Sequence, residues 1–312
     1  MARYRNQLPQ LSDTIFLMPA GLETDLIYNQ GFEIPGFATH ILLQDPKGRD
    51  AIASYYRQYL ALAREQDTGI VLDTQTWKAH MHWAAEQGVT EEELHQANHE
   101  SAAFIAGLRD EFSDMTKPIV LDGIVGPRGD CYAPEEEIAA LEAEKYHAKQ
   151  IGWLAETEVD MITAATLNQT DEAIGIVRAA QAVELPVVIS FTLETDGNLQ
   201  TGQSLKDAIV AVDEATDSGA AYFMVNCTHL DHFAHLLEDR AWAHRIKGVF
   251  CNASRKSHAE LEASDTLDDG NPVEFGEQHK AMRDRSPWIN VFGGCCGCDI
   301  RHVTEIAHAL IP

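Results

Sequence analysis

Eight short runs of β-branched and aliphatic residues recur along the chain, and a turn and a longer helical pattern follow each run. The runs are residues 14–18, 69–73, 118–122, 159–163, 186–191, 221–225, 246–250 and 288–292. Each is nearly continuous in apolar residues, which is typical of a parallel strand that is buried on both faces. Eight strand–helix units in 312 residues favour an α/β fold of the (β/α)8 TIM barrel type, with eight parallel strands.

The segments between the runs carry apolar residues at helical spacing. Residues 49–66 and 135–156 repeat them at i, i+3, i+4 and i+7. Residues 90–112 open with Thr90 and Glu93, the spacing of a capping box. The competing architecture is a doubly wound open sheet, but neither a G-x-G-x-x-G turn after the first run nor a phosphate-binding loop is present. We therefore predict a single barrel domain over residues 1–312.

The chain is strongly acidic, with 23 Lys and Arg residues against 49 Asp and Glu residues and a formal net charge of −26. Such a surface repels phosphate backbones and anionic lipid, which argues against nucleic-acid and membrane partners, and it favours a cationic small molecule. Residues 1–13 lack the apolar core of a signal peptide, and no stretch approaches 18 apolar residues. We therefore expect a cytoplasmic protein.

Three of the six cysteines follow the ends of predicted strands. Cys227 comes just after the sixth run, and Cys295 and Cys296 come just after the eighth. The carboxyl ends of barrel strands share one rim, so these thiols should converge. Cytoplasmic thiols stay reduced, which favours a metal site or a catalytic site over a disulfide. Three thiolates with an open fourth position suit a catalytic Zn²⁺ ion, and a substrate thiol is the natural fourth ligand.

A thiol bound to such an ion becomes a nucleophile at neutral pH, and the simplest electrophile is a methyl group on a sulfonium or an ammonium. At this point the motifs V-N-C-T-H (225–229) and G-G-C-C-G (293–297) resemble the two zinc-ligand motifs of the zinc-dependent homocysteine S-methyltransferases. The segments D-T-Q-T-W-K-A (73–79) and G-I-V-G-P-R-G-D-C-Y (123–132) extend this resemblance, which covers nearly the whole chain.

The resemblance implies a (β/α)8 fold with Zn²⁺ held by Cys227, Cys295 and Cys296. It also implies transfer of a methyl group to homocysteine, giving methionine, and therefore a part in methionine biosynthesis. The implied donor is S-methylmethionine, S-adenosylmethionine, a betaine or a dimethylsulfonio compound. The length leaves no room for a cobalamin domain within the chain, and a separate corrinoid protein and a homo-oligomer both stay open.

The chain departs from the family pattern at two strand ends. The family usually has Asp-Gly-Gly after the first strand and Glu-Thr after the fourth, whereas this chain has Pro19 and Ala20, and then Ala165. In the family those acids help to hold the ammonium group of the substrate, and Glu23 or Asp25 can replace them here. Two alternatives therefore remain: an acceptor thiol without an amino group, and a non-catalytic zinc-binding relative.

Residues at the strand ends are the expected substrate contacts. The Trp77 ring can hold a cationic methyl group or simply pack at the rim, and Asn226 can orient Cys227 or the acceptor. No catalytic residue is expected beyond the metal site, because the metal takes the role of a general base. The expected contacts are Gly21, Thr24, Thr76, Trp77, Ser190 and Asn226.

Three further features allow two readings each. Cys298 is an alternative metal ligand or a residue of the turn. His229, His232 and His235 recur at a spacing of three, which suits a second metal site or a solvated helical face. The polar residues 252–278 form a lid or an ordinary surface loop.

Overall fold

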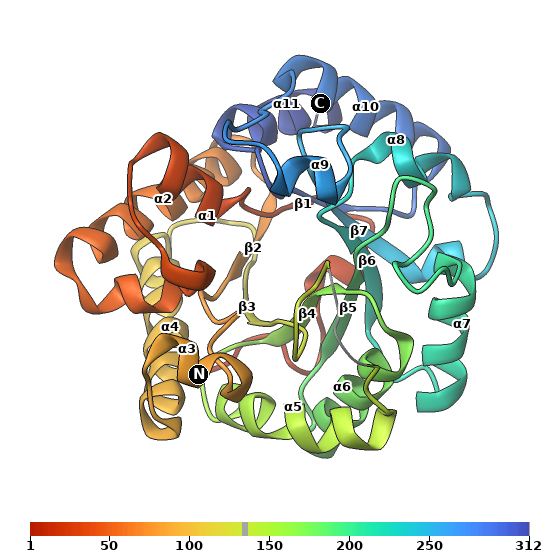
Figure 1. Cartoon of the computed structure of the whole chain (residues 1–312). Coiled ribbons are helices and arrows are strands. Elements are labelled where there is room, and N and C mark those ends of the chain that lie inside the picture. The colour runs from red at the N-terminus through yellow and green to blue at the C-terminus, as the bar shows by residue number, and fades with distance from the viewer. Residues whose placement is uncertain (133–136, 312) are drawn as a thin grey trace.

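The computed structural model of the chain describes residues 1–132 and 137–311. Its parallel strands close into a barrel in sequence order, and β1 pairs with both β2 and β8 (Figure 1). The predicted (β/α)8 TIM barrel is therefore confirmed. The strands are β1 Phe16–Leu17, β2 Gly69–Asp73, β3 Ile119–Val125, β4 Met161–Leu167, β5 Val187–Phe191, β6 Tyr222–Asn226, β7 Ile246–Cys251 and β8 Val291–Gly294.

The long helices form a ring around the barrel, and short helices lie in the loops that follow strands β1, β2, β6 and β7 (Figure 1). The helices are α1 Leu22–Thr24, α2 Pro46–Glu65, α3 Ala84–Gln87, α4 Glu91–Glu111, α5 Ala140–Ala155, α6 Thr170–Ala182, α7 Leu205–Thr216, α8 Leu230–Phe233, α9 His258–Glu262, α10 Pro272–Arg285 and α11 Ile300–Leu310. None of the helices in the described part of the chain is both long enough and apolar enough to cross a membrane.

Local sequence signals set several helix starts. The capping box predicted at Thr90 and Glu93 opens α4, and both of its hydrogen bonds are present. The helix predicted over residues 135–156 is shorter than expected, because α5 begins only at Ala140. Ile138 is buried, and its backbone N–H donates to Gln169 Oε1 at 3.0 Å, so a tertiary contact replaces the first predicted turn. Residues 135 and 136 lie outside the described residues.

Inward-facing side chains fill the barrel. They alternate along the strands, as the period of two requires, and the N-terminal segment adds Leu8 to them. Gln10 Nε2 donates to Tyr222 Oη at 3.3 Å, which closes the amino end of the barrel. The inner apolar cluster is Leu8, Phe16, Met18, Val71, Val120, Met161, Val188, Tyr222, Met224 and Val291.

The inward positions become polar toward the carboxyl end of the strands. They lie two residues beyond members of the apolar cluster, so alternation turns them to the same side of the sheet. This polar layer is Asp73, Asp122, Thr163, Ser190 and Asn226. The open end of the barrel is therefore lined by groups that can receive a polar ligand.

Candidate metal centre

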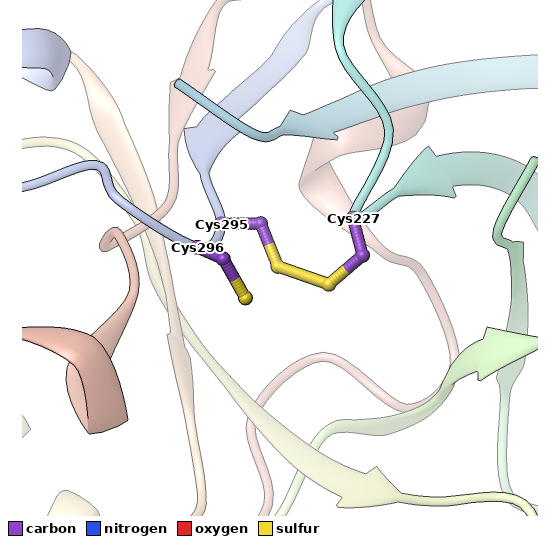
Figure 2. A group of neighbouring side chains, drawn as sticks. All are labelled: Cys227, Cys295 and Cys296. Atoms are coloured by element: carbon purple, nitrogen blue, oxygen red, sulfur yellow. A yellow bond between two sulfur atoms is a disulfide. The ribbon is translucent and has the colours of Figure 1, made fainter. Parts of the chain in front are cut away.

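The thiols of Cys227, Cys295 and Cys296 meet at the carboxyl-terminal rim of the barrel. Cys227 directly follows β6, whereas the other two directly follow β8 (Figure 2). Their three sulfur atoms all lie within 4.8 Å of one another. Cys227 and Cys295 are buried, and Cys296 is half-buried. The structure thus brings together the thiols that the sequence places at strand ends, while their role as metal ligands stays a prediction.

Cys227 and Cys295 are joined as a disulfide, with their Cα atoms 5.5 Å apart, and Cys296 keeps a free thiol (Figure 2). This differs from the expectation of three reduced thiols. The physical reason is proximity, because sulfur atoms held this close can share a metal ion or, once oxidised, can bond to each other. The disulfide and the three-thiol cluster are therefore alternative redox states of the same residues.

Asn252, the residue after β7, joins the two cysteine segments. Its Nδ2 group donates to the Cys227 carbonyl at 2.9 Å, and its Oδ1 atom accepts from the Cys296 N–H at 3.1 Å. Cys227 has a φ of 51°, which is a costly left-handed conformation for a residue other than glycine. His258 Nε2 also donates to its carbonyl, at 2.7 Å. Two side chains thus hold the backbone of Cys227 in this conformation.

Two of the predicted substrate residues support the second cysteine segment. A Cβ atom at Gly21 would lie 2.5 Å from the carbonyl oxygen of Cys295, so only glycine permits this close approach. Thr24 Oγ1 accepts from the Gly297 N–H at 3.3 Å, at a point where Gly297 has a φ of 79°. The loop after β1 is therefore docked directly on the cysteine turn.

Trp77 and Thr76 lie at the mouth between β2 and β4. The Trp77 indole N–H donates to the carbonyl of Ala165 at 3.1 Å, and the Lys78 ammonium lies 5.7 Å from its ring centroid. Thr76 is fully buried, and its hydroxyl donates to the Ile124 carbonyl at 2.6 Å. Thr76 therefore satisfies backbone groups, whereas Trp77 links the loop after β2 to β4.

Ser190 and Asn226 belong to a polar network inside the barrel. The Ser190 hydroxyl donates to Asn226 Oδ1 at 2.6 Å, and Asn226 Nδ2 donates to Thr166 Oγ1 at 2.8 Å. Asn226 Oδ1 also accepts from the Thr166 N–H at 2.9 Å, which holds Thr166 at a φ of 65°. The Asn226 side chain thus fixes the end of β4, whereas the side chains of Asn252 and His258 bond to the Cys227 backbone.

Two carboxyl groups lie on the rim that carries the thiols, and sequence reasoning proposed only the first, Glu23. Glu23, on α1, is half-buried and accepts from the Thr39 hydroxyl at 2.6 Å. Asp73 ends β2, and among the described residues its buried Oδ1 atom has no hydrogen-bond partner. Burial raises the pKa of Asp73 to about 7, and the charge on Glu23 adds to the rise. Burial likewise raises the pKa of the Cys296 thiol to about 11, and Glu23 again contributes.

Cys298 lies apart from the three-thiol cluster. Its side chain is 1% exposed, and its thiol donates to the Cys251 carbonyl at 3.3 Å. Within the described residues, no convergent group of metal-ligating atoms includes it. These contacts favour the interpretation of Cys298 as a packed residue of the turn over its interpretation as a metal ligand.

The histidine-rich segment does not form a continuous helix. α8 ends at Phe233, and a separate 3-10 turn follows it. The rings of His229 and His232 are 6.0 Å apart, and His232 Nε2 contacts the Arg255 carbonyl. Among the described residues, no convergent metal-ligating group includes these histidines.

A different convergent group lies on the protein surface. Nε2 of His95 and of His99, one turn apart on α4, lie 3.3 and 3.2 Å from Oε2 of Glu156, which follows α5. All three side chains are at least one-third exposed.

The polar segment 252–278 contributes a cover beside the thiols. It contains α9, which begins with a capping box of Ser257 and Glu260 and lies inside the ring of outer helices (Figure 1). The ring of His258 stacks on Tyr132 at 4.2 Å, and its Nδ1 atom lies 3.2 Å from Glu194 Oε1. Loops after β3, β5 and β7 are thereby tied together next to Cys227.

Comparison with known proteins agrees with this architecture. The family described as homocysteine S-methyltransferase matches residues 17–310. The oxidized form of the homocysteine methyltransferase MmuM from Escherichia coli superposes with a TM-score of 0.72 at 17% identity, covering 95% of each chain. Its metallated form gives a TM-score of 0.71 at 16% identity, covering 95% of this chain and 96% of that chain. At these identities the likeness shows the fold alone.

A search of curated protein sequences found no match to this chain. The family match spans nearly all of the barrel, including the cysteines that follow β6 and β8. It confirms the family that the sequence motifs indicate. The chain belongs to the homocysteine S-methyltransferase family and is a methyltransferase enzyme.

Proposed function

We propose that this enzyme uses Zn²⁺ to transfer a methyl group from a cationic sulfonium or ammonium donor to homocysteine, giving methionine. The observation that carries the proposal is the convergence of three sulfur atoms within 4.8 Å at the barrel rim. Thiolates are the ligands that Zn²⁺ prefers, and three of them leave one tetrahedral position for a substrate. Cys227, Cys295 and Cys296 would hold the ion in their reduced state.

Bound Zn²⁺ would lower the pKa of an acceptor thiol, so that a thiolate is available at neutral pH. The chain itself fixes the place of attack. Asn252 and His258 hold the backbone of Cys227, and the loop after β1 holds the turn at residues 295–297. This preorganisation aligns the acceptor sulfur with the donor methyl group.

The transfer is a displacement at carbon. The acceptor sulfur forms a bond to the methyl carbon while the bond from that carbon to the donor sulfur or nitrogen breaks. The electron pair of the broken bond stays with the donor, which leaves as a neutral sulfide or tertiary amine. The net charge of −26 favours the approach of a cationic donor, and we propose S-methylmethionine, S-adenosylmethionine, a betaine or a dimethylsulfonio compound.

The cluster must be reduced to bind a metal, so we propose the cytoplasm as the working compartment. MmuM from Escherichia coli has been crystallised in an oxidized form and in a metallated form. We propose the same two states for the cluster in this chain, with the disulfide as the oxidised one.

The test is zinc-edge X-ray absorption of the reduced, zinc-loaded protein with and without L-homocysteine. A His99→Ala background removes the surface group on α4 and α5, so that bound zinc reports on the cysteines. We expect three sulfur ligands to become four when homocysteine is added. Three in both states would refute homocysteine as the acceptor, and no zinc after reconstitution would refute the metal site.

A further inference from the structure

We propose that Glu23 and Asp73 bind the ammonium group of the acceptor, so that this methyltransferase selects an α-amino thiol. The inference rests on the proposed function, because it takes the acceptor sulfur to lie at the three-cysteine cluster. The two carboxyl groups would act by contact with the substrate and would take no part in the methyl transfer itself.

The order of the strands places both carboxyl groups on the rim that carries the cluster. β8, β1 and β2 are consecutive neighbours in the closed barrel. Cys295 and Cys296 follow β8, Glu23 lies in the loop after β1, and Asp73 is the last residue of β2. Glu23 therefore lies between the cysteine turn and Asp73, on the same rim.

Contacts of the β1 loop bring Glu23 close to the cysteine turn. The Gly21 N–H donates to the Cys298 carbonyl at 3.3 Å, and Thr24 accepts from the Gly297 N–H at 3.3 Å. Glu23 stands between these two anchored residues, and its charge acts on both the Cys296 thiol and the Asp73 carboxyl group. We therefore infer that an acceptor with its sulfur at the cluster directs its ammonium group toward these two carboxyl groups.

Both carboxyl groups have unused hydrogen-bonding capacity. Asp73 Oδ1 is buried and, in the described part of the chain, accepts no hydrogen bond. The Thr39 hydroxyl is the side-chain donor to Glu23, although a carboxylate can accept about four bonds. Two half-buried carboxyl groups that repel each other are costly to ionise together, and a cation between them offsets that cost. An ammonium group supplies the positive charge together with three N–H donors.

Two other acids near the mouth are less accessible to an ammonium group or are already paired. Both carboxylate oxygens of Asp25 already accept bonds, from Asn29 Nδ2 at 2.8 Å and from Gln30 Nε2 at 2.7 Å. Asp122 is paired with Asp73 in the register of β2 and β3, and its Oδ1 atom also has no partner among the described residues. Asp122 is fully buried, however, and its Oδ2 atom accepts from the Thr163 hydroxyl at 2.5 Å, whereas Asp73 is only half-buried. Asp25 thus offers a matched control, because it lies two residues from Glu23 on the same loop.

The experiment compares L-homocysteine with its des-amino analogue, 4-mercaptobutanoate, by calorimetric binding to the reduced, zinc-loaded protein. We expect the unmodified protein to bind homocysteine more tightly. Glu23→Gln and Asp73→Asn should each weaken homocysteine binding by about 10- to 100-fold, as expected for a lost charge-assisted hydrogen bond. Neither substitution should alter binding of 4-mercaptobutanoate or the zinc content by more than about twofold. Asp25→Asn should leave both affinities unchanged.

The outcomes separate this inference from the proposed function. Equal affinity of the unmodified protein for the two thiols, or unchanged homocysteine binding in both variants, would overturn the ammonium anchor while the metal-centred acceptor site stands. An equal loss for both thiols would also overturn it, because the amino group would then not be the group recognised. Failure of the unmodified protein to bind either thiol would overturn the proposed function and this inference together.

Discussion

Replacing Asn252 with alanine should lower both the zinc affinity of the cysteine cluster and the stability of the fold, and the loss of zinc affinity should be specific to this position. Asn252 is 3% exposed and makes one hydrogen bond to each cysteine segment, at 2.9 and 3.1 Å. The bond to the Cys227 carbonyl contributes about 1 kcal/mol, and leaving the partly buried Cys296 N–H unpaired costs about 1–2 kcal/mol. We therefore expect the free energy of unfolding of the metal-free, reduced protein to fall by about 2–3 kcal/mol, and zinc affinity to fall by about 10- to 100-fold.

The assay is competition for zinc against a chromophoric chelator under reducing conditions, with chemical denaturation in parallel. Asn290→Ala is the matched control. Asn290 is 1% exposed, and its amide donates to the carbonyls of Gln10, Ser12 and Thr14, at the opposite end of the barrel. It should lower stability by a similar amount and leave zinc affinity unchanged. Equal zinc affinities in the two variants would refute the argument that Asn252 positions the thiols.

Three further outcomes follow from the buried groups. Cys298→Ser should keep bound zinc and Cys296→Ser should lose it, as measured by atomic absorption of the reduced protein; zinc loss in the first variant would make Cys298 a ligand. Asp160 is fully buried, accepts from the backbone N–H groups of Arg3, Tyr4 and Leu121, and pairs with Arg109. Asp160→Asn should therefore lower the free energy of unfolding by about 3 kcal/mol, and a denaturation midpoint that does not move would contradict this. Burial lowers the pKa of His279 from 6.5 to about 4. As the pH falls, the unfolded chain therefore takes up the proton before the folded protein does, and the free energy of unfolding should decrease between pH 6.5 and pH 4. Urea titrations of His279→Gln should show a smaller decrease over this range.

Strand positions could be predicted where β-branched residues fill the strand. The run at 69–73 coincides with β2, Gly69–Asp73. The prediction for β4 ended too early, because Ala164 and Ala165 carry little strand signal and Thr166 has a left-handed backbone that only Asn226 in β6 explains. The prediction for β8 also ended too early, because its last two residues, Gly293 and Gly294, carry no strand signal. A Cβ atom at Gly293 would lie 2.7 Å from the Phe250 ring, so neighbouring strands require the glycine there.

The cysteines were predictable and most of their partners were not, for one physical reason. A residue just after a parallel barrel strand lies on a known rim, so the convergence of Cys227 with Cys295 and Cys296 follows from strand order. Asn252 bonds to both segments only because β7 lies between β6 and β8. Asp73 is a plain strand end in the sequence, and its unpaired oxygen emerges only once its neighbours are in place.

The shared mouth of the barrel changes how the replacement of the family's two acids by Pro19 and Ala165 should be interpreted. A position-by-position comparison finds Pro19 and Ala165 where the family has acids, and suggests that the handle for an amino group is lost. All eight strand ends of a barrel face one mouth, however, so a carboxyl group can move to another strand end and still reach the same ligand. Glu23 lies on the same loop as Pro19, and Asp73 lies on the next strand. The mouth therefore keeps two carboxyl groups on the rim that carries the thiols, and under the proposed ammonium anchor these groups, rather than the aligned positions, decide which thiol the enzyme selects.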